Sequence, residues 1–363
     1  MRLCVLDQSG TAFGRTPADA VQETLALARH CDGLGYHRYW MAEHHNSAAQ
    51  AGTAPEVLMA AVAATTRRIR VGSAGVMLPH YSALKVAEVF RVLEAIAPGR
   101  IDMGLGRAPG SDGRTAYALN PLAGEAAEHF PAQVRDLLAW VGGTGLPEGH
   151  PFRGVAAQPA GPTVPEAWIL GSSDYGAQVA AHFGLPYCFA HFITDGRGAA
   201  EAMEVYRRAY RPNARHPEPY GAVCVWALAA DTDAEADRLF TSRAHWRLGR
   251  DRGIYAPLLS PEEVAAHPHT EAERARMAQI RARALVGTGP EVMARLRALA
   301  GELGVREVAV LGIAHDPAAR RRSYTLLAEA AGLREADPAA FARPTPGAGL
   351  GEPGPPGPRP AAR

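Results

Sequence analysis

Polar side chains that could carry out chemistry follow four short apolar runs of the chain. The first three of these turns recur about every 30 residues, roughly the length of one β-α unit. In a parallel α/β fold the carboxyl ends of the strands meet on one face, and ligands bind there. We therefore expect all four turns to line one pocket. They are Glu43-His44-His45, Gly72-Ser73-Ala74-Gly75, Gly104-Leu105-Gly106-Arg107 and Gly171-Ser172-Ser173-Asp174.

The turn with two histidines could bind a metal, form a hydrogen-bonded cluster or supply an acid or base. Neighbouring side chains of a strand point to opposite faces, so His44 and His45 would not easily share one ion. The HExxH spacing of zinc proteases is absent from this turn. A histidine titrates near neutral pH, and we expect the carboxylate of Glu43 to favour the charged ring of His44. We expect no metal here, which leaves acid-base catalysis and a structural cluster as the two interpretations.

The glycine-rich turns could hold a flat or an anionic ligand. Small residues at 72–75 permit either a bend of the strand or close approach of a ligand to the backbone. The run around Arg107 differs from the GxGxxG fingerprint, because its third glycine is displaced and Pro109 interrupts the helix start. Arg107 could bind a phosphate or form a surface salt bridge. Ser172 and Ser173 precede a helix and could form an anion site that binds the same phosphate as Arg107, or else Ser173 or Asp174 simply caps this helix.

Eight apolar runs of strand length alternate with helical patterns, which indicates a (β/α)8 barrel rather than an open sheet. Thr16 before Pro17, and Thr53 with capping-box spacing to Glu56, are predicted to open the first two helices. Residues 243–283 form a charged, mostly helical insertion that fits a lid over the barrel mouth. The predicted strands cover residues 3–6, 37–42, 69–78, 101–105, 167–170, 186–192, 222–229 and 307–311.

Composition limits the classes of protein to which the chain could belong. It has 363 residues, 47% of them hydrophobic, and a formal net charge of +1, so we expect a soluble protein that binds neither nucleic acid nor membranes. We expect one barrel domain over residues 1–336 and a disordered tail, rich in Pro, Gly, Ala and Arg, over residues 337–363. Neither a signal peptide nor a membrane-spanning run is found, and the cytoplasm is the expected compartment.

Two further expectations concern thiols and assembly. The four cysteines lack CxxC spacing and are expected to be buried and reduced. The helical patterns at 55–66 and 86–96 carry little charge for exposed barrel helices, so we expect a homodimer that covers them.

Several longer runs resemble the flavin-dependent bacterial luciferase-like monooxygenases, and especially the single-chain luciferase-like oxidoreductases. The resemblance extends from Leu3 to Leu333, and the motifs keep their order and their places at strand ends. It implies a (β/α)8 barrel that binds reduced FMN at the carboxyl ends of its strands. The runs are YWMAEHHN, RIRVGSAGVMLPHYSALKVAEVF, LEAIAPGRIDMGLGRAPGSD, WILGSSDYGAQVAAHFGLP and VGTGPEV.

The resemblance also implies an activity. Reduced FMN from a separate flavin reductase would react with O2 to a C4a-(hydro)peroxide, which oxygenates a small organic substrate. An F420-dependent hydride-transfer enzyme on the same fold is one alternative, and a non-catalytic flavin-binding protein is another. Family members are commonly dimers.

Site residues are implied by the same resemblance. Luciferase has a reactive cysteine where this chain has Gly106, which leaves more room beside the flavin ring and weakens the expectation of light emission. The implied residues are Glu43 and His44 beside the ring, with His44 as the acid-base group, a cis peptide bond at Ala74–Gly75, and Arg107, Ser172 and Ser173 around the phosphate.

Overall fold

The protein folds as a closed barrel of eight parallel strands, which confirms the predicted (β/α)8 class. The computed structural model describes residues 1–333, so the predicted tail at 337–363 lies outside the described residues. The barrel closes because β10 pairs with both β1 and β8. Its strands are β1 (Arg2–Asp7), β2 (Arg38–Met41), β3 (Arg70–Ser73), β5 (Ile101–Gly106), β6 (Glu166–Gly171), β7 (Tyr187–Ala190), β8 (Gly221–Ala230) and β10 (Glu307–Leu311).

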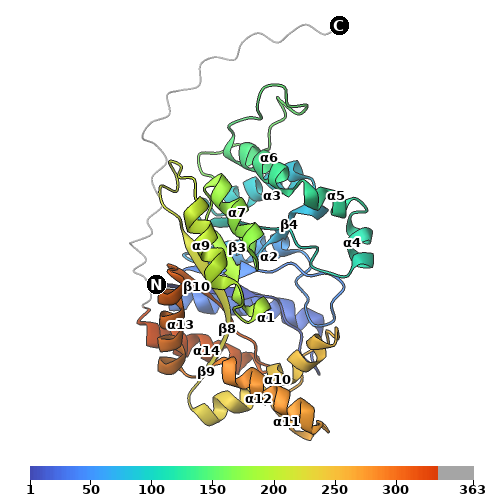
Figure 1. The fold of residues 1–363 in the computed structure, drawn as a ribbon, viewed down its shortest axis with the longest axis vertical. Helices are drawn as coiled ribbons and strands as arrows, with labels where there is room; N and C mark the ends of the chain where they lie inside the picture. Colours follow the sequence, from blue (N-terminus) through green and yellow to red (C-terminus); the bar gives the residue numbers. More distant parts are fainter. Residues whose placement is uncertain (334–363) are drawn as a thin grey trace.

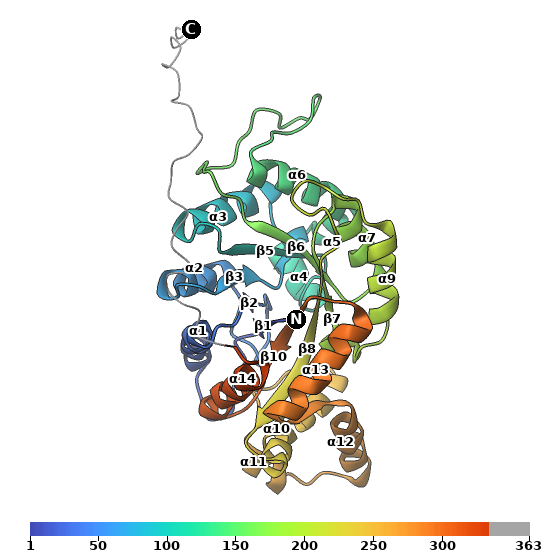
Figure 2. The ribbon, with the colours of Figure 1, turned by 90° about the vertical axis from the view of Figure 1, so that its left-hand side faces the viewer.

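Helices surround the barrel on its outside, as Figure 2 shows. Thr16 caps the first helix as predicted, in a capping box with Asp19. The second prediction was wrong: Thr53 stands one residue too early, and Ala54 occupies the N-cap because Pro55 takes the first helical position. The surrounding helices are α1 (Pro17–Leu34), α2 (Pro55–Thr65), α3 (Ala83–Ile96), α6 (Phe130–Gly142), α7 (Asp174–Phe183), α9 (Ala199–Ala209), α13 (Gly289–Leu303) and α14 (Pro317–Ala331).

The insertion after β8 is helical, as predicted, although it begins ten residues before position 243. Its helices α10 (Asp233–Asp251), α11 (Pro261–Ala266) and α12 (Glu271–Arg283) lie together at one end of the molecule (Figure 1). Sequence patterns missed β9 (Leu285–Thr288), which extends the sheet beside the last residues of β8. The strand was missed because four residues, one of them a glycine, are too few to show the alternation of apolar and polar residues that marks a strand. The remaining short elements are β4 (Val76–Met77), η1 (Leu78–His80), α4 (Gly113–Leu119), α5 (Ala123–Glu128) and α8 (His191–Thr194).

Alternate side chains of the strands fill two separate layers of the core. One set, from β1, β2, β6, β7, β8 and β10, forms one contact cluster that fills the interior and continues onto residues of α10 and β9. The other set packs under the surrounding helices. All four cysteines are buried and free, as predicted, and Cys31 alone among them lies on a helix, α1, and belongs to the outer layer. The interior cluster includes Cys4, Leu6, Trp40, Ala42, Trp168, Cys188, Cys224, Trp226, Ala309 and Leu311.

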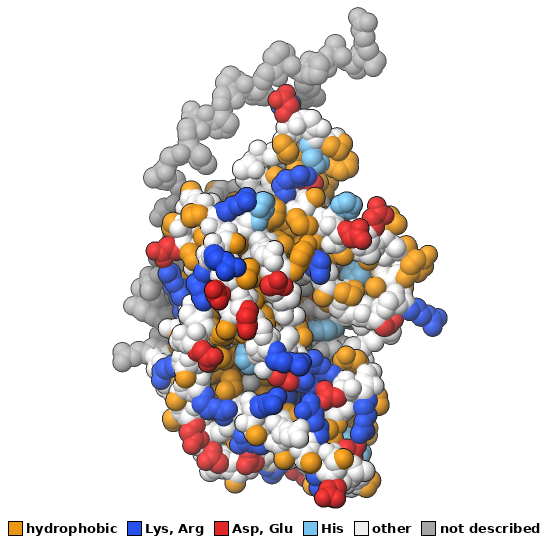
Figure 3. Space-filling model, in the orientation of Figure 1, with side chains coloured by type: hydrophobic (Ala, Val, Ile, Leu, Met, Phe, Trp, Pro, Cys, Tyr) orange, Lys and Arg blue, Asp and Glu red, His pale blue; other side chains and the backbone are white. Residues whose placement is uncertain are grey.

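The surface of the barrel carries both signs of charge in an interspersed pattern (Figure 3). None of the described helices is both long enough and apolar enough to cross a membrane. Helices α2 and α3 expose Val57, Val92 and Ile96, with exposed fractions of 64%, 48% and 47%. The homodimer through these helices stays a prediction.

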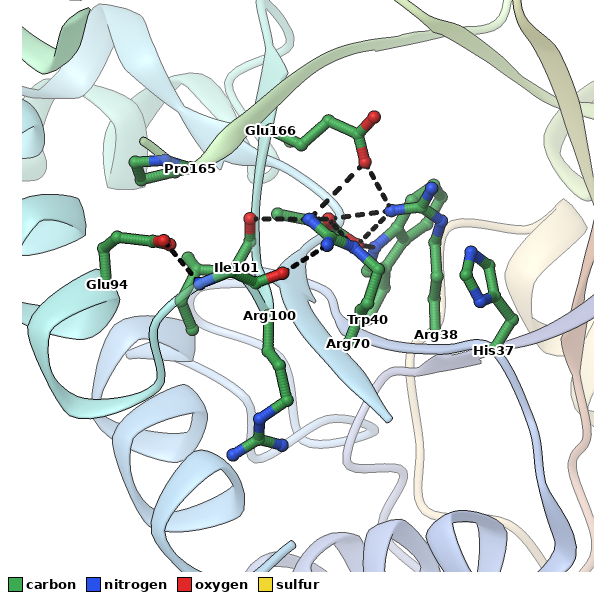
Figure 4. A network of polar contacts seen from close by, with 12 residues as sticks. His37, Arg38, Trp40, Arg70, Glu94, Arg100, Ile101, Pro165 and Glu166 are labelled. Carbon is green, nitrogen blue, oxygen red and sulfur yellow. Dashed lines mark hydrogen bonds and ion pairs between the residues drawn. The ribbon is translucent and has the colours of Figure 1, made fainter. Parts of the chain in front are cut away.

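A buried charge network closes the amino end of the barrel interior (Figure 4). Arg38 is 3% exposed and donates to Asp102 and Glu166 at 2.8 Å each. Its Nε donates to Glu307 at 2.8 Å. Burial alone would raise the pKa values of Asp102 and Glu307, but Arg38, together with the other charges and hydrogen bonds around the two carboxylates, holds both below their ordinary values. Arg70 adds a second ion pair to Asp102, at 2.6 Å.

We predict that Arg38→Met lowers the free energy of unfolding by about 3–5 kcal/mol, because it removes the buried cation that pairs with both Asp102 and Glu307. Urea unfolding at pH 7 measures the loss. Arg306→Met is the control, since the pair of Arg306 with Glu218 is mostly exposed and such pairs contribute about 0–1 kcal/mol.

The same network predicts the direction of acid sensitivity. The folded-state pKa values of Asp102 and Glu307 lie below their unfolded values, so the network stabilises the fold above about pH 4 and loses this effect as the pH falls further. Arg38→Met should therefore lose less stability than the wild type when the pH falls below 4. An equal loss in Arg38→Met and Arg306→Met at pH 7 would contradict the assignment.

Candidate active site

The four predicted turns lie at the carboxyl ends of four neighbouring strands, in the order β2, β3, β5 and β6. We call the carboxyl ends of the barrel strands the barrel mouth. Trp40 and Ala42 belong to the interior cluster, and His44 continues the same alternation. Ala74 packs against that cluster directly. The sequence-predicted residues are therefore brought to one side of the barrel mouth.

Gly75 and Gly106, both at the barrel mouth, differ in whether the surrounding packing leaves room for a side chain. The Ala74–Gly75 peptide bond is cis, as the resemblance implied. A Cβ on Gly75 would lie 2.9 Å from the carbonyl oxygen of Gly104, so packing against the neighbouring strand requires this glycine. A Cβ on Gly106 would meet only the carbonyl oxygen of Val76, at 3.8 Å, among the described residues. Open space therefore lies beside Gly106, at the place where a flat ligand would approach the backbone.

Arg107 lies against the first turn of α7. The carbon at the centre of its guanidinium lies 3.9 Å from the ring centroid of Tyr175, and the side chain is exposed. It forms no ion pair with any described residue, so the surface salt bridge that we considered is not present. Ser173 is the N-cap residue, yet its hydroxyl makes no capping hydrogen bond. The carboxylate of Asp174 instead accepts a hydrogen bond from Gln178, at 3.3 Å.

These groups together fit an anion. The first N–H groups of a helix have no partner within it, and the positive end of the helix dipole attracts negative charge. Arg107, Ser172, Ser173 and the amino end of α7 therefore form a candidate phosphate site, which is one of the interpretations that the residues left open and the one that the resemblance implied.

Glu43 contacts His45 and not His44, which corrects the expected pairing. Residues 43 and 45 lie on the same side of an extended chain, whereas 43 and 44 point to opposite sides. His45 Nε2 lies 2.8 Å from Glu43 Oε1, and Tyr81 donates its hydroxyl to the same oxygen at 2.6 Å. The backbone N–H of Met77 donates to Oε2 at 3.0 Å. Three of about four acceptor sites of this buried carboxylate are occupied, so Glu43 holds the strand ends together.

His44 is neutral in this environment, which overturns the expectation of a charged ring. Burial, and to a smaller extent the neighbouring His45, lowers the pKa of His44 to about 4. Its Nδ1 atom is buried and has no hydrogen-bond partner among the described residues. A neutral imidazole with a free nitrogen can accept a proton or donate a hydrogen bond at neutral pH.

Arg243 and Trp226 are mouth residues that sequence reasoning did not find. Arg243 is 6% exposed, and its guanidinium carbon lies 4.0 Å from the ring centroid of Trp226. Neither Arg243 Nε nor Trp226 Nε1 has an acceptor within residues 1–333. Burial, followed by Arg247 and Arg250, lowers the pKa of Arg243 to about 9, so it stays charged at neutral pH. No local motif could reveal this pair, because one residue lies on β8 and the other on α10.

A cavity of about 60 Å³ lies at another part of the barrel mouth, between the carboxyl ends of β1 and β10 and the start of α1. Asp7 and Arg320 in its wall form a buried ion pair at 2.7 Å. The cavity is far smaller than the roughly 300–1,000 Å³ of cofactor sites, and it contains none of the predicted turns.

Comparison with known proteins identifies the family. Residues 1–307 match the family model of luciferase-like monooxygenases. The chain belongs to this family. It is 38% identical to a luciferase-like monooxygenase of Escherichia coli K12, over 89% of this chain and 94% of the relative. It is 35% identical to the N-acetyl-S-alkylcysteine monooxygenase of Bacillus subtilis, over 91% and 98%.

Solved structures agree with this assignment. The structure of apo-MsnO8 has 37% sequence identity and a TM-score of 0.82, covering 92% of this chain and 98% of that one. More distant structures share the fold alone. One is the oxygenating constituent of 3,6-diketocamphane monooxygenase from Pseudomonas putida, bound to FMN (19% identity, TM-score 0.65, coverage 91% and 97%). Another is an F420-dependent secondary alcohol dehydrogenase (14% identity, TM-score 0.60, coverage 91% and 98%).

We predict that the ring of His44 titrates with a midpoint near 4 in the ligand-free protein. Histidine ring resonances measured by NMR, with His44→Gln to assign the signal, give the midpoint directly. The folded-state pKa lies below the unfolded value of about 6.5, so His44 opposes folding as the pH falls from 6.5 toward 4. Between pH 7 and 5 the wild type should lose about 1–2 kcal/mol more stability than His44→Gln. A midpoint of 6 or higher would contradict the prediction.

Proposed function

We propose that the protein is a flavin-dependent monooxygenase that uses reduced FMN from a separate flavin reductase, together with O2, to oxygenate a small organic substrate. The observation that carries the proposal is Arg107 beside the first turn of α7, with no acidic partner among the described residues and an uncommitted Ser173 hydroxyl. This set fits the phosphate of FMN, and the open space beside Gly106 fits a flat ring. A distant member of the fold binds FMN.

The residues of the site would bind different parts of FMN. Arg107, Ser172, Ser173 and the amino end of α7 would bind the phosphate, and Ala74, Gly75 and Gly106 would receive the ring. When bound, reduced FMN supplies the electrons that activate O2.

His44 would be the acid-base group of the site. Its neutral imidazole would hold or pass a proton at Nδ1, close to the ring. Glu43 would act as a positioning residue, because its bonds to His45, Tyr81 and Met77 fix the end of β2 against β4 and η1. The apolar interior below the mouth would exclude water from the reacting atoms.

F420 remains the second candidate cofactor, since an F420-dependent enzyme shares the fold and both cofactors carry a phosphate on a ribityl chain. Oxygen consumption with photoreduced FMN separates the two, because hydride transfer through F420 uses no O2. A non-catalytic flavin-binding protein would bind FMN and form no product.

We predict that Arg107→Ala weakens FMN binding by about 1.5–3 kcal/mol, the scale of a hydrogen bond to a charged group. Riboflavin, which lacks the phosphate, should bind the wild type and the variant equally. Flavin fluorescence titration measures both affinities. Arg208→Ala, an exposed arginine on α9, is the control and should bind FMN like the wild type. Equal FMN affinity of Arg107→Ala and the wild type would refute the phosphate assignment.

We predict that His44→Ala leaves FMN affinity nearly unchanged, because the phosphate binds elsewhere. Product formed per FMN oxidised should fall at least ~100-fold, the usual contribution of a general acid-base group. Flavin oxidation should continue and release hydrogen peroxide. The measurement uses a flavin reductase supply and a substrate panel that begins with an N-acetyl-S-alkylcysteine, the class that names one relative.

One control variant makes the His44 result decisive. His182→Ala, an exposed histidine on α7, should keep the wild-type ratio of product to peroxide. Wild-type product yield in His44→Ala would show that His44 is structural.

A further inference from the structure

Three histidines of the insertion converge at a place that the proposed flavin chemistry does not use. His245 lies on α10, His267 follows α11, and His269 lies in the loop before α12. Their ligand nitrogens all lie within 4.8 Å of one another, and His245 Nδ1 lies 2.8 Å from His269 Nε2. The ring centroids are 4.6 to 5.1 Å apart. His245 and His269 are half-buried, and His267 is exposed.

The local sequence explains how two of the rings reach the same side. Pro268 restricts the residue before it to extended backbone, and His267 has φ −73° and ψ 131°. The N–H of His269 donates to the carbonyl oxygen of His267 at 2.8 Å, a tight turn around Pro268 that leaves the two ring centroids 4.6 Å apart. Capping bonds hold both sides of this segment: His267 ends α11, and Thr270 forms a capping box with Glu273 at the start of α12. The segment is thus fixed before any ligand arrives.

We propose that His245, His267 and His269 bind a divalent transition-metal ion, and that Zn²⁺ is the ion this set fits. Three imidazoles with no carboxylate among them suit zinc and disfavour calcium and magnesium, which prefer oxygen ligands. Tetrahedral zinc with bonds of about 2.0–2.1 Å to nitrogen separates its ligand nitrogens by roughly 3.3 Å. The observed separations, from 2.8 Å to at most 4.8 Å, bracket this value. The exposed side at His267 leaves a fourth position for water.

Neighbouring charges largely cancel beside the three rings. The carboxylate of Glu273 favours the charged form of His245 and is itself paired with Arg252, at 2.8 Å. Arg274 donates to the backbone carbonyl of His269, not to its ring. Burial, and then the other two histidines, lowers the pKa of His245, which keeps its ring in the neutral form that ligates metals.

A bound ion would replace the hydrogen bond between His245 and His269 and join α10 to the loop between α11 and α12. Ion pairs already connect α10 with α12, through Asp251 with Arg276 and Asp237 with Arg281. The ion would add a strong link to α11, whose C-cap residue is His267. Because α10 also carries Arg243 over Trp226, the metal would stabilise the part of the insertion that covers the barrel mouth.

The test is Zn²⁺ binding to the full-length protein after removal of metals with EDTA. Competition with a chromophoric chelator should show one ion per chain, and His267→Gln and His269→Gln should each bind at least ~100-fold more weakly. Co²⁺ in place of Zn²⁺ should give the visible absorption of a tetrahedral site in the wild type alone. Saturating Zn²⁺ should raise the Tm of the wild type by about 2–4 °C and leave that of both variants unchanged.

His182→Gln on α7 is the matched control and should bind Zn²⁺ like the wild type. Because His267 and His269 lie at the surface or half-buried in a loop, their variants should keep the far-ultraviolet circular dichroism of the wild type, and His245→Gln gives a third check. Equal binding by the wild type and His269→Gln, or weak binding without saturation, would overturn the proposal. Neither result bears on FMN binding, so the proposal stands or fails separately from the proposed function.

Discussion

Arg38 ties together four strands across the interior of the barrel. It lies on β2 and binds Asp102 on β5, Glu166 on β6 and Glu307 on β10. A parallel barrel needs its strands held at a fixed stagger, and a planar group with several donors inside the ring can fix that stagger from within. The network also fills the amino end with charges that satisfy one another, and Trp40 and Trp168 pack above it, with ring centroids 5.1 Å apart. Space for a ligand is therefore left at the carboxyl end.

The two ends of the interior differ in how completely their polar atoms are bonded. At the carboxyl end, His44 Nδ1, Trp226 Nε1 and Arg243 Nε are buried without a partner among residues 1–333. Lower in the barrel, Trp168 Nε1 is also unpaired, but its ring lies under the guanidinium of Arg38, at 4.8 Å. Buried polar groups without partners cost roughly 1–3 kcal/mol each. Their concentration at one end indicates that this end is built for a partner that is not part of the chain.

The strands could be predicted because each depends on a local run of apolar residues, and the turns that follow them were found for the same reason. Arg107 and Ser173 were grouped correctly because parallel topology alone brings consecutive strand ends together. The partner of Glu43 was missed, although the alternation of an extended chain already favoured His45 over His44. Arg243 over Trp226 could not have been found, because the contact joins an insertion helix to a strand and leaves no spacing pattern.

The insertion is held more firmly than the expectation of a lid suggests. Arg247 on α10 binds Asp195, beyond α8, at 3.0 Å, and it also binds Asp251 at 2.8 Å. A helix bonded to the barrel in this way, and carrying the buried Arg243, cannot swing away without breaking these pairs. The segment between α10 and α11 exposes Ile254 and Tyr255 at its start, whereas Leu258 near its end is held by two backbone hydrogen bonds, to Thr11 and Phe13. Opening of the mouth would therefore involve this short segment rather than α10, while α10 keeps Arg243 in place above the barrel interior.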